Sequence, residues 1–324
     1  MKALQVIQPG SFSVVQVPKP ILDNDARDRI LVRTSWVSMC GSDIPFFNGG
    51  KPSLPYPLHW GEHIHECVGM VLSSTSQNFQ AGDWVVAIPE ANRGLAELFI
   101  AQANKAVRIV ENGEDKSDFC LIQPLSTVMN AVDRLGDIAG STVAVIGLGS
   151  IGILFCWLLR KQGAGQIIGI DPLASRCDVA DNFGADQTFP IKSDEYVRNA
   201  RDSTRIIPIG VCIESVGHQM QTINDCFAII QKHGTVLAFG VPDQPVYPIE
   251  YETFFRKNAR LIAAVTPVWK EYLEKAQDLF LEHRDELTPL ITHRLTVQDA
   301  EKAFKMYADH SDGICKAIID FSHW

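Results

Sequence analysis

The sequence has no long block of like charges. Its 324 residues include 29 lysines and arginines and 38 aspartates and glutamates, for a net charge of −9 at pH 7. Without a basic stripe, the chain lacks the electrostatic footprint of a protein that binds nucleic acid or an anionic membrane. The first ten residues also lack the apolar core and cleavage site of a signal peptide.

Paired cysteines are missing as well. None of the eight cysteines belongs to a CxxC pair, and several lie in apolar runs, where a free thiol packs as a small hydrophobic group. No nearby quartet of cysteines is available for a closed structural zinc site. Scattered free thiols suit a reducing compartment, so we expect a cytoplasmic protein.

Long apolar runs are almost absent. One uncharged run, residues 138–159, is long enough to cross a bilayer, but four glycines interrupt it. We interpret this run as a strand, a turn and a helix rather than as a membrane span. The sequence also shows no internal repeat.

This run contains a glycine-rich turn. Val143–Ile146 is typical of a buried parallel strand, GLGSIG follows, and an apolar helical pattern continues it. In a dinucleotide-binding turn the three glycines permit the strand exit, the approach of the pyrophosphate and close helix packing, and the helix start offers free N–H groups. The residues expected to contact the cofactor are Gly147, Leu148, Gly149, Ser150, Ile151 and Gly152.

An acidic residue follows the next strand. Asp171 comes directly after the apolar stretch 166–170, where a carboxylate can accept hydrogen bonds from the adenosine ribose. The same carboxylate repels a 2′-phosphate, which favours NAD over NADP, although Arg176 could partly offset that repulsion.

The two parts of the chain differ in pattern. The first third has short strand signals with frequent turns and an irregular stretch at 44–60, whereas strands and helices alternate from about residue 118. We therefore expect an α/β protein with a β-rich part and a doubly wound parallel sheet. The expected parallel strands are 142–146, 166–170, 186–189, 206–213, 234–240 and 260–265, with helices at 151–162, 173–183 and 219–231.

Possible metal ligands lie in the β-rich part. Cys40 and the segment 59–66, which includes His65 and Glu66, offer a thiolate, imidazoles and a carboxylate. Zn²⁺ prefers these groups, and a catalytic zinc needs three protein ligands and one open position. Taken alone, however, these residues are also compatible with unrelated core and surface positions.

The order of the motifs adds a family resemblance. CGSD at 40–43, HECVGMV at 65–71, AGDWVV at 81–86, GLAE at 94–97 and the glycine turn follow one another. The chain resembles the zinc-dependent medium-chain dehydrogenase/reductase family over essentially its whole length, with most likeness to the polyol and threonine dehydrogenase branch. The resemblance implies a GroES-like catalytic domain at 1–125, a Rossmann NAD-binding domain at 126–265, and a C-terminal segment, 266–324, that returns to the catalytic domain.

The resemblance also implies roles for the metal-site residues. Cys40 and His65 match the catalytic zinc ligands, and Glu66 matches a neighbouring acid that binds the metal in some members. Asp43 matches an acid that orients the ligand histidine, a role that fixes the imidazole tautomer.

Further residues match family positions that transfer the substrate proton or contact the cofactor. Ser42 matches the hydroxyl that passes on the substrate proton, and Thr127 matches a residue near the nicotinamide. Gly240 and Val241, at the end of the fifth strand, are expected to present backbone groups to the carboxamide.

The sequence departs from the family pattern in four places. Ile64 replaces the glycine before the ligand histidine, which leaves His63 as an alternative to His65. The third ligand position holds Gln123, a neutral and doubtful ligand, and the usual relay histidine position holds Pro45. The four-cysteine lobe is absent, so the resemblance implies one catalytic Zn²⁺ and no structural zinc.

The resulting hypothesis is oxidation of a secondary alcohol, a polyol or related hydroxylated metabolite, by hydride transfer to NAD. The small-molecule substrate would be handled by a homodimer or homotetramer that associates near strand 260–265. Two alternatives stay open: a zinc-free reductase of the same fold, and a nucleotide-binding regulatory protein without turnover.

Overall fold

The computed structural model describes residues 1–23, 27–51, 54–111, 113, 115–202 and 207–324. These residues form two compact units, one of Met1–Ser126 with Val268–Trp324 and the other of Thr127–Pro267. The boundaries expected after residues 125 and 265 lie one and two residues away from these.

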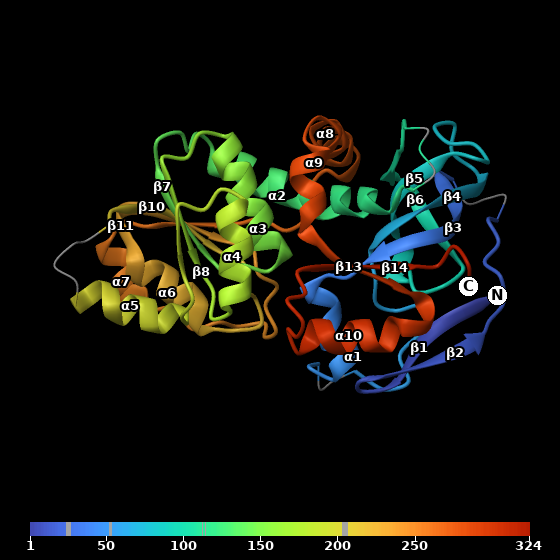
Figure 1. Cartoon of the computed structure of the whole chain (residues 1–324), viewed down its shortest axis with the longest axis horizontal. Coiled ribbons are helices and arrows are strands. Elements are labelled where there is room, and N and C mark those ends of the chain that lie inside the picture. Colours follow the sequence, from blue (N-terminus) through green and yellow to red (C-terminus); the bar gives the residue numbers. More distant parts are fainter. Residues whose placement is uncertain (24–26, 52–53, 112, 114, 203–206) are drawn as a thin grey trace. The chain divides into compact units, whose positions relative to one another are not determined.

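The first unit is built on β-sheet. A β1–β2 hairpin stands beside a sheet in the order β13-β14-β3-β4-β5-β6, and an additional β3–β6 pairing closes four of these strands on one another (Figure 1). The strands are β1 (Lys2–Gln8), β2 (Ser11–Gln16), β3 (Arg29–Ser38), β4 (Glu66–Ser74), β5 (Trp84–Pro89), β6 (Leu98–Arg108), β13 (Ile291–Thr296) and β14 (Lys316–Asp320).

The C-terminal segment is part of this unit. β14 pairs antiparallel with β3, and one hydrophobic core joins side chains such as Ile30 and Val71 to Phe304 and Ile319. The helices of the unit are α1 (Ile44–Asn48), α8 (Trp269–Glu282), α9 (Arg284–Leu287) and α10 (Ala300–Ala308), and α2 (Ile122–Leu135) leads into the second unit.

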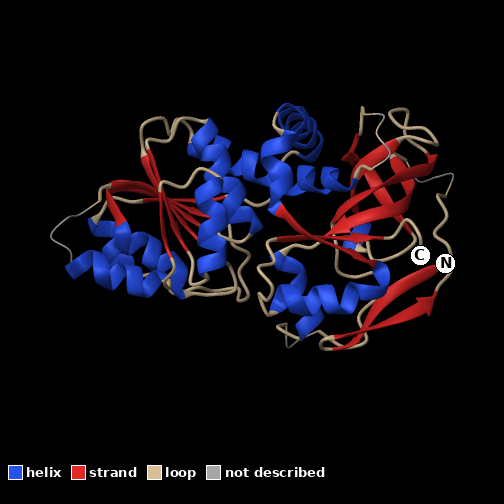
Figure 2. Ribbon diagram, in the orientation of Figure 1, coloured by secondary structure: helices blue, strands red, loops and turns tan. Residues whose placement is uncertain are grey.

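The second unit is a doubly wound parallel sheet, which confirms the expected fold class. Its order is β12-β11-β10-β7-β8-β9, and Figure 2 shows the strands as a fan with helices on both sides. Helices α3 and α4 lie on one face and α5, α6 and α7 on the other (Figure 1). The elements are β7 (Thr142–Ile146), α3 (Ser150–Lys161), β8 (Gln166–Ile170), α4 (Ala174–Asn182), β9 (Gln187–Phe189), α5 (Ser193–Asp202), β10 (Ile209–Glu214), α6 (Gln221–Ile229), β11 (Ile230–Ala238), α7 (Tyr251–Arg256) and β12 (Arg260–Ala263).

The strand order indicates where a ligand is expected to bind in the second unit. Chain direction across the sheet reverses between β7 and β10, and in open parallel sheets ligands bind at the carboxyl ends of the strands beside such a point. The glycine turn leaves the sheet there, directly after β7.

Three element predictions need correction. The helix predicted over 219–231 ends at Ile229, because Ile230 pairs with Ile209 as the first residue of β11. Within the stretch 44–60, expected to be irregular, α1 forms with a proline in its first turn, where the missing N–H costs no hydrogen bond; residues 52–53 lie outside the described part. The predicted strand 206–213 is β10, and its first residue also lies outside that part.

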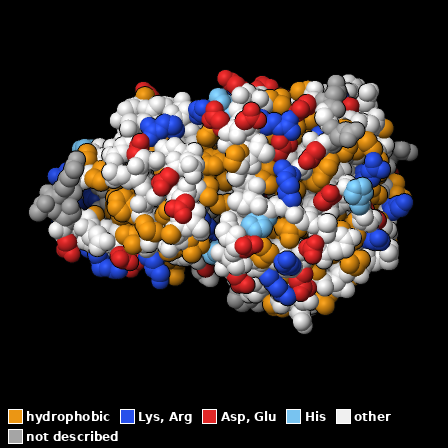
Figure 3. Space-filling view, viewed as in Figure 1, with side chains coloured by type: hydrophobic (Ala, Val, Ile, Leu, Met, Phe, Trp, Pro, Cys, Tyr) orange, Lys and Arg blue, Asp and Glu red, His pale blue; other side chains and the backbone are white. Residues whose placement is uncertain are grey.

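The surface and the helices agree with the composition. On the face drawn in Figure 3, acidic and basic side chains are interspersed rather than gathered into a block of one sign. Among the described residues, every helix is too short or too polar to span a bilayer.

Candidate metal centre and cofactor turn

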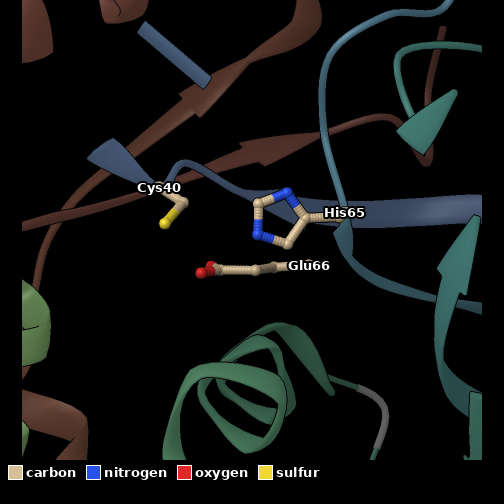
Figure 4. Close-up of side chains that lie close together, drawn as sticks. All are labelled: Cys40, His65 and Glu66. Carbon is tan, nitrogen blue, oxygen red and sulfur yellow. The ribbon is translucent and has the colours of Figure 1, made fainter. Parts of the chain in front are cut away.

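The pairing of β3 with β4 brings the expected metal ligands together. Ser38, the last residue of β3, pairs with Glu66, the first of β4. Cys40 follows β3 by two residues and His65 precedes β4 by one, so both stand at the same end of the strand pair. The ligand atoms of Cys40, His65 and Glu66 lie within 4.8 Å of one another, and Figure 4 shows the three side chains facing a common point.

Glu66 is held by one of its two oxygens. The ammonium of Lys316 lies 2.5 Å from Oε2, and the Ser38 hydroxyl donates to the same oxygen. Burial raises the pKa of the Glu66 carboxyl, and the Lys316 charge opposes that effect. Among the described residues no hydrogen-bond donor reaches the buried Oε1. That oxygen is therefore available to a metal.

Lys316 was not predicted as a site residue. It is fully buried, and its ammonium also donates to the Met39 carbonyl at 2.9 Å. A sequence signal was present, because Lys316 is the only charged residue in the otherwise apolar run Ile314–Ile319. A lysine in such a run is rarely buried without an acidic partner.

Asp43 connects the two histidines. It is the last residue of a 3₁₀ turn over Gly41–Asp43, and its Oδ2 accepts the Cys40 N–H at 2.8 Å. Its Oδ1 lies 2.9 Å from His63 Nδ1 and 3.2 Å from His65 Nδ1. The His63 contact is a hydrogen bond, whereas the His65 contact has the distance of an ion pair without hydrogen-bond geometry.

Neighbouring histidines explain why Asp43 is ionised. Burial alone would raise the pKa of Asp43, but the charge of His65 and the hydrogen bond and charge of His63 together outweigh burial and lower it to about 2. For His65 the two effects act in the opposite directions. Burial lowers the pKa of its imidazole, but the Asp43 carboxylate and Cys40 outweigh burial and raise that pKa well above its usual value. Asp43 is therefore a carboxylate at neutral pH.

The residues present fit a zinc ion. A thiolate, an imidazole and a carboxylate are the donors that a catalytic zinc takes. With Cys40 as a thiolate and His65 neutral, as metal ligands must be, three negative groups (the Cys40 sulfur, Glu66 and Asp43) face one buried ammonium among the described residues, that of Lys316. A divalent cation would bring the cluster to neutrality. Gln123, buried in the first turn of α2, stays a doubtful ligand because its amide is neutral.

The glycine turn has the shape of a phosphate cradle. Gly147 has φ 92°, and a Cβ on Gly152 would stand 1.8 Å from the Gly147 carbonyl oxygen, so neither position tolerates a side chain without movement. A Cβ on Gly149 would meet no heavy atom within 4 Å. The space over Gly149 is open in front of the α3 N-terminus, where Ser150 and Ile151 begin the helix.

Asp171 is tied to this turn. Its Oδ2 accepts the Leu148 N–H at 2.8 Å and its Oδ1 accepts the Leu173 N–H at 2.9 Å. Oδ1 keeps a second lone pair for a ribose hydroxyl, whereas Oδ2 also accepts a long hydrogen bond from Arg176. The Arg176 guanidinium lies 3.5 Å from Oδ2, close enough to offset part of the acid's charge.

The Gly240 region approaches the end of β10 closely. A Cβ on Gly240 would lie 2.2 Å from the Gly217 nitrogen, and Gly240 N–H donates to the Glu214 carbonyl. The Val241 carbonyl accepts the His218 N–H at 2.9 Å. Some of the backbone groups expected at the carboxamide are thus used within the unit, and their contact with nicotinamide stays a prediction.

Thr127 and Glu214 are two further residues of the cofactor-binding unit. Thr127 is buried on α2 as the first residue of the second unit, and its role stays a prediction. Glu214 was missed: its Oε1 accepts the N–H groups of Val216 and Gly217 and so supports the loop after β10.

Comparison with known families identifies the chain. The family described as "Alcohol dehydrogenase GroES-like domain" matches residues 26–111, and the one described as "Zinc-binding dehydrogenase" matches residues 150–282. The chain belongs to the zinc-dependent medium-chain dehydrogenase/reductase family. This membership confirms the resemblance seen in the motifs, and it makes the chain an oxidoreductase of the alcohol-dehydrogenase type.

The relatives of this chain have low sequence identity to it but match most of its length. A sorbitol dehydrogenase of Bacillus subtilis is 22% identical over 77% of each chain, and an alcohol dehydrogenase of Cupriavidus necator is 23% identical over 98% of each. The structure of an alcohol dehydrogenase from Thermus sp. ATN1 matches with a TM-score of 0.83 at 21% identity, covering 99% of both chains. The structural likeness shows a shared fold.

Proposed function

We propose that this dehydrogenase oxidises a secondary alcohol of the polyol class, with Zn²⁺ at Cys40, His65 and Glu66 and with NAD as the hydride acceptor. The observation that carries the proposal is the grouping of these three ligand atoms within 4.8 Å, with Glu66 Oε1 buried and open to a metal. A polyol substrate is suggested by the sorbitol dehydrogenase relative.

Each residue has a defined task in this proposal. A bound zinc ion supplies a Lewis acid that lowers the pKa of an alcohol, and a bound nicotinamide supplies the hydride acceptor. Cys40, His65 and Glu66 hold the ion, and Asp43 keeps the proton of His65 on Nδ1. Ser42, partly exposed two residues after Cys40, accepts the hydroxyl proton of the substrate and passes its own hydroxyl proton on to the cofactor ribose or to solvent, while the substrate carbon loses hydride to the nicotinamide.

The cofactor proposal rests on the second unit. The open space over Gly149 suits a pyrophosphate, and the Asp171 carboxylate suits the ribose hydroxyls and repels a 2′-phosphate. NAD should therefore bind more tightly than NADP, with Arg176 reducing the difference. Fluorescence titration with NADH and NADPH tests this order, and tighter NADPH binding would overturn the interpretation of Asp171.

Metal analysis tests whether Cys40, His65 and Glu66 bind zinc. Purified protein should contain about one zinc per chain, and Cys40→Ala should lose both the metal and the NADH signal produced with polyols. Asp43→Asn is a milder variant that keeps the three ligands. Equal zinc in the wild type and Cys40→Ala would remove Cys40 from the ligand set.

One alternative has a specific observation in its favour. Lys316 already pairs with Glu66, and Gln123 is neutral, so a zinc-free reductase of the same fold would need no metal to balance Glu66. Turnover that survives complete removal of zinc by a chelator would support that alternative and end the zinc proposal.

The homodimer or homotetramer also stays a proposal. β12 is an edge strand of its sheet, and Leu261 on it and Val265 just beyond it are exposed. An exposed apolar edge strand favours pairing with a second copy. Sedimentation of the wild type and a Leu261→Lys variant tests whether association depends on this edge.

A further inference from the structure

His63 lies beside the proposed metal ligands and is held on three sides. Its Nδ1 is 2.9 Å from Asp43 Oδ1, its Nε2 is 2.8 Å from Asn92 Nδ2, and its ring stacks on Phe46 with centroids 3.9 Å apart. Its side chain is 13% exposed. So many contacts on one half-enclosed imidazole indicate a defined orientation.

The hydrogen bonds of this network follow from Asn92. The Asn92 amide nitrogen can only donate, so His63 Nε2 accepts from it and carries no proton. The other ring nitrogen, Nδ1, then carries the ring proton and donates to Asp43 Oδ1. Asn92 therefore selects the tautomer of His63 that donates to Asp43.

Asp43 is fixed through both of its oxygens. Oδ2 accepts the Cys40 N–H and Oδ1 accepts His63, and together these bonds determine the plane of the carboxylate. His65 meets the same Oδ1 through its Nδ1, at 3.2 Å. Its Nε2 is then the nitrogen left for the point where Cys40 and Glu66 converge (Figure 4).

Asn92 comes from the short turn that follows β5. It follows β5, where the sequence has no four-cysteine lobe, and it ends a short 3₁₀ turn over Glu90–Asn92. Asn92 has φ 54°, a left-handed conformation that asparagine tolerates, and its carbonyl accepts the Ile64 N–H at 2.8 Å. This bond holds the turn against the segment that carries both histidines.

We propose that His63, held by Asn92, is a positioning residue that fixes the Asp43 carboxylate so that His65 keeps Nε2 directed at the metal site. The inference rests on the proposed function, because it takes Cys40, His65 and Glu66 as the metal-binding group. His63 itself stays outside that group and acts through Asp43. The short turn after β5 thereby contributes to metal binding without supplying a ligand.

Three variants isolate the hydrogen bonds. His63→Phe keeps a flat ring against Phe46 but removes both hydrogen bonds. His63→Asn keeps an N–H donor close to the position of Nδ1, and Asn92→Gly keeps the left-handed backbone while removing the amide. Phe46→Leu removes the stacked ring and leaves every polar contact in place.

The measurement is the affinity of the full-length apoprotein for Zn²⁺ by chelator competition, with the visible spectrum of the Co²⁺ form as a probe of ligand geometry. Loss of groups behind a metal ligand typically weakens metal binding 10- to 100-fold. We expect His63→Phe and Asn92→Gly to bind Zn²⁺ about tenfold more weakly, with altered Co²⁺ bands. His63→Asn and Phe46→Leu should stay near the wild type.

The outcomes separate the two proposals. If the wild type takes up neither Zn²⁺ nor Co²⁺, the proposed metal centre and this inference both fail. If the wild type binds zinc and His63→Phe and Asn92→Gly bind it equally well, only the positioning role is overturned. The same holds if Phe46→Leu weakens binding as much as His63→Phe, because packing alone would then account for the effect. Circular dichroism of each apoprotein checks folding, and Asn92→Gly decides the question if His63→Phe does not fold.

Discussion

At the scale of single residues, environment decides which of several similar groups can act. Cys40 is the one cysteine of the eight that is not buried. Burial raises the pKa of the Cys67 and Cys120 thiols well above their usual value, which makes them poor nucleophiles and poor ligands. The difference lies in the surroundings and not in the residue type.

We predict that a thiol reagent modifies Cys40 well before any other cysteine of the native chain. Thiolate reactivity depends on access as well as on pKa, and Cys40 alone has access. Stoichiometric Zn²⁺ should suppress this labelling, and Cys40→Ser should abolish it. Peptide mass spectrometry after timed iodoacetamide treatment identifies the site. Equal early labelling of several cysteines, or no protection by zinc, would contradict the prediction.

Lys316 and Glu66 form a buried ion pair whose removal should be costly. Breaking such a pair from one side leaves an uncompensated charge and typically costs about 3–5 kcal/mol. We expect Lys316→Met to lower the free energy of unfolding of the apoprotein by about that amount. Adding Glu66→Gln should restore much of the loss, because no buried charge then lacks its partner. Urea unfolding of both single variants and the double variant completes the cycle. Additive losses would show that the pair is not coupled.

At the scale of elements, the turn between β7 and α3 contains glycines with different tasks, one in packing and one in leaving room for a ligand. Gly152 faces the Gly147 carbonyl, whereas Gly149 faces open space. Two glycines three residues apart therefore have different requirements: one is needed for packing, and the other leaves room for a ligand.

We predict contrasting effects of alanine at these two glycines. Gly152→Ala should destabilise the second unit by about 1–3 kcal/mol or more, since overpacking forces α3 away from β7. Gly149→Ala should leave stability almost unchanged, because its φ of −67° suits alanine, but should weaken NADH binding by filling the cradle. Thermal unfolding and NADH fluorescence titration measure the two effects. NADH binding unchanged in Gly149→Ala would place the pyrophosphate elsewhere.

At the scale of the whole molecule, each unit has its own ligand chemistry and its own core. The proposed metal ligands and the neighbouring residues Asp43, His63 and Lys316 all belong to the first unit. The glycine turn and Asp171 belong to the second, which has a separate hydrophobic cluster around Ile168 and Phe227. Binding of one ligand should therefore stabilise chiefly one unit.

Hydrogen exchange should show this division. A ligand at 100 times its Kd stabilises the state that binds it by about 2.7 kcal/mol. We expect Zn²⁺ to slow exchange at the adjoining ends of β3 and β4, and NAD to slow it in β7, β8 and the start of α3. Cys40→Ala and Gly149→Ala are the matched controls. Equal protection of both units by zinc alone would contradict the division.

The sequence by itself determined the features that local chain geometry controls. The three glycines and Asp171 follow consecutive elements of one strand–turn–helix–strand unit, so their spacing alone predicts a cofactor turn. Family motifs likewise led to Cys40, Asp43, His65 and Glu66, which stand at the ends of paired strands. Element boundaries were less certain where an apolar run fits either period, as at Ile229 and Ile230.

Only the tertiary structure decided the partners of these residues. Lys316 meets Glu66 through the pairing of β14 with β3, and Asn92 meets His63 through a turn after β5. The structure also gives the two histidines different neighbours: both lie near Asp43, but only His65 is grouped with Cys40 and Glu66, whereas His63 contacts Asn92. Such contacts depend on strand pairing and packing between segments far apart in the chain, and no local pattern specifies which distant side chain will face a given ligand.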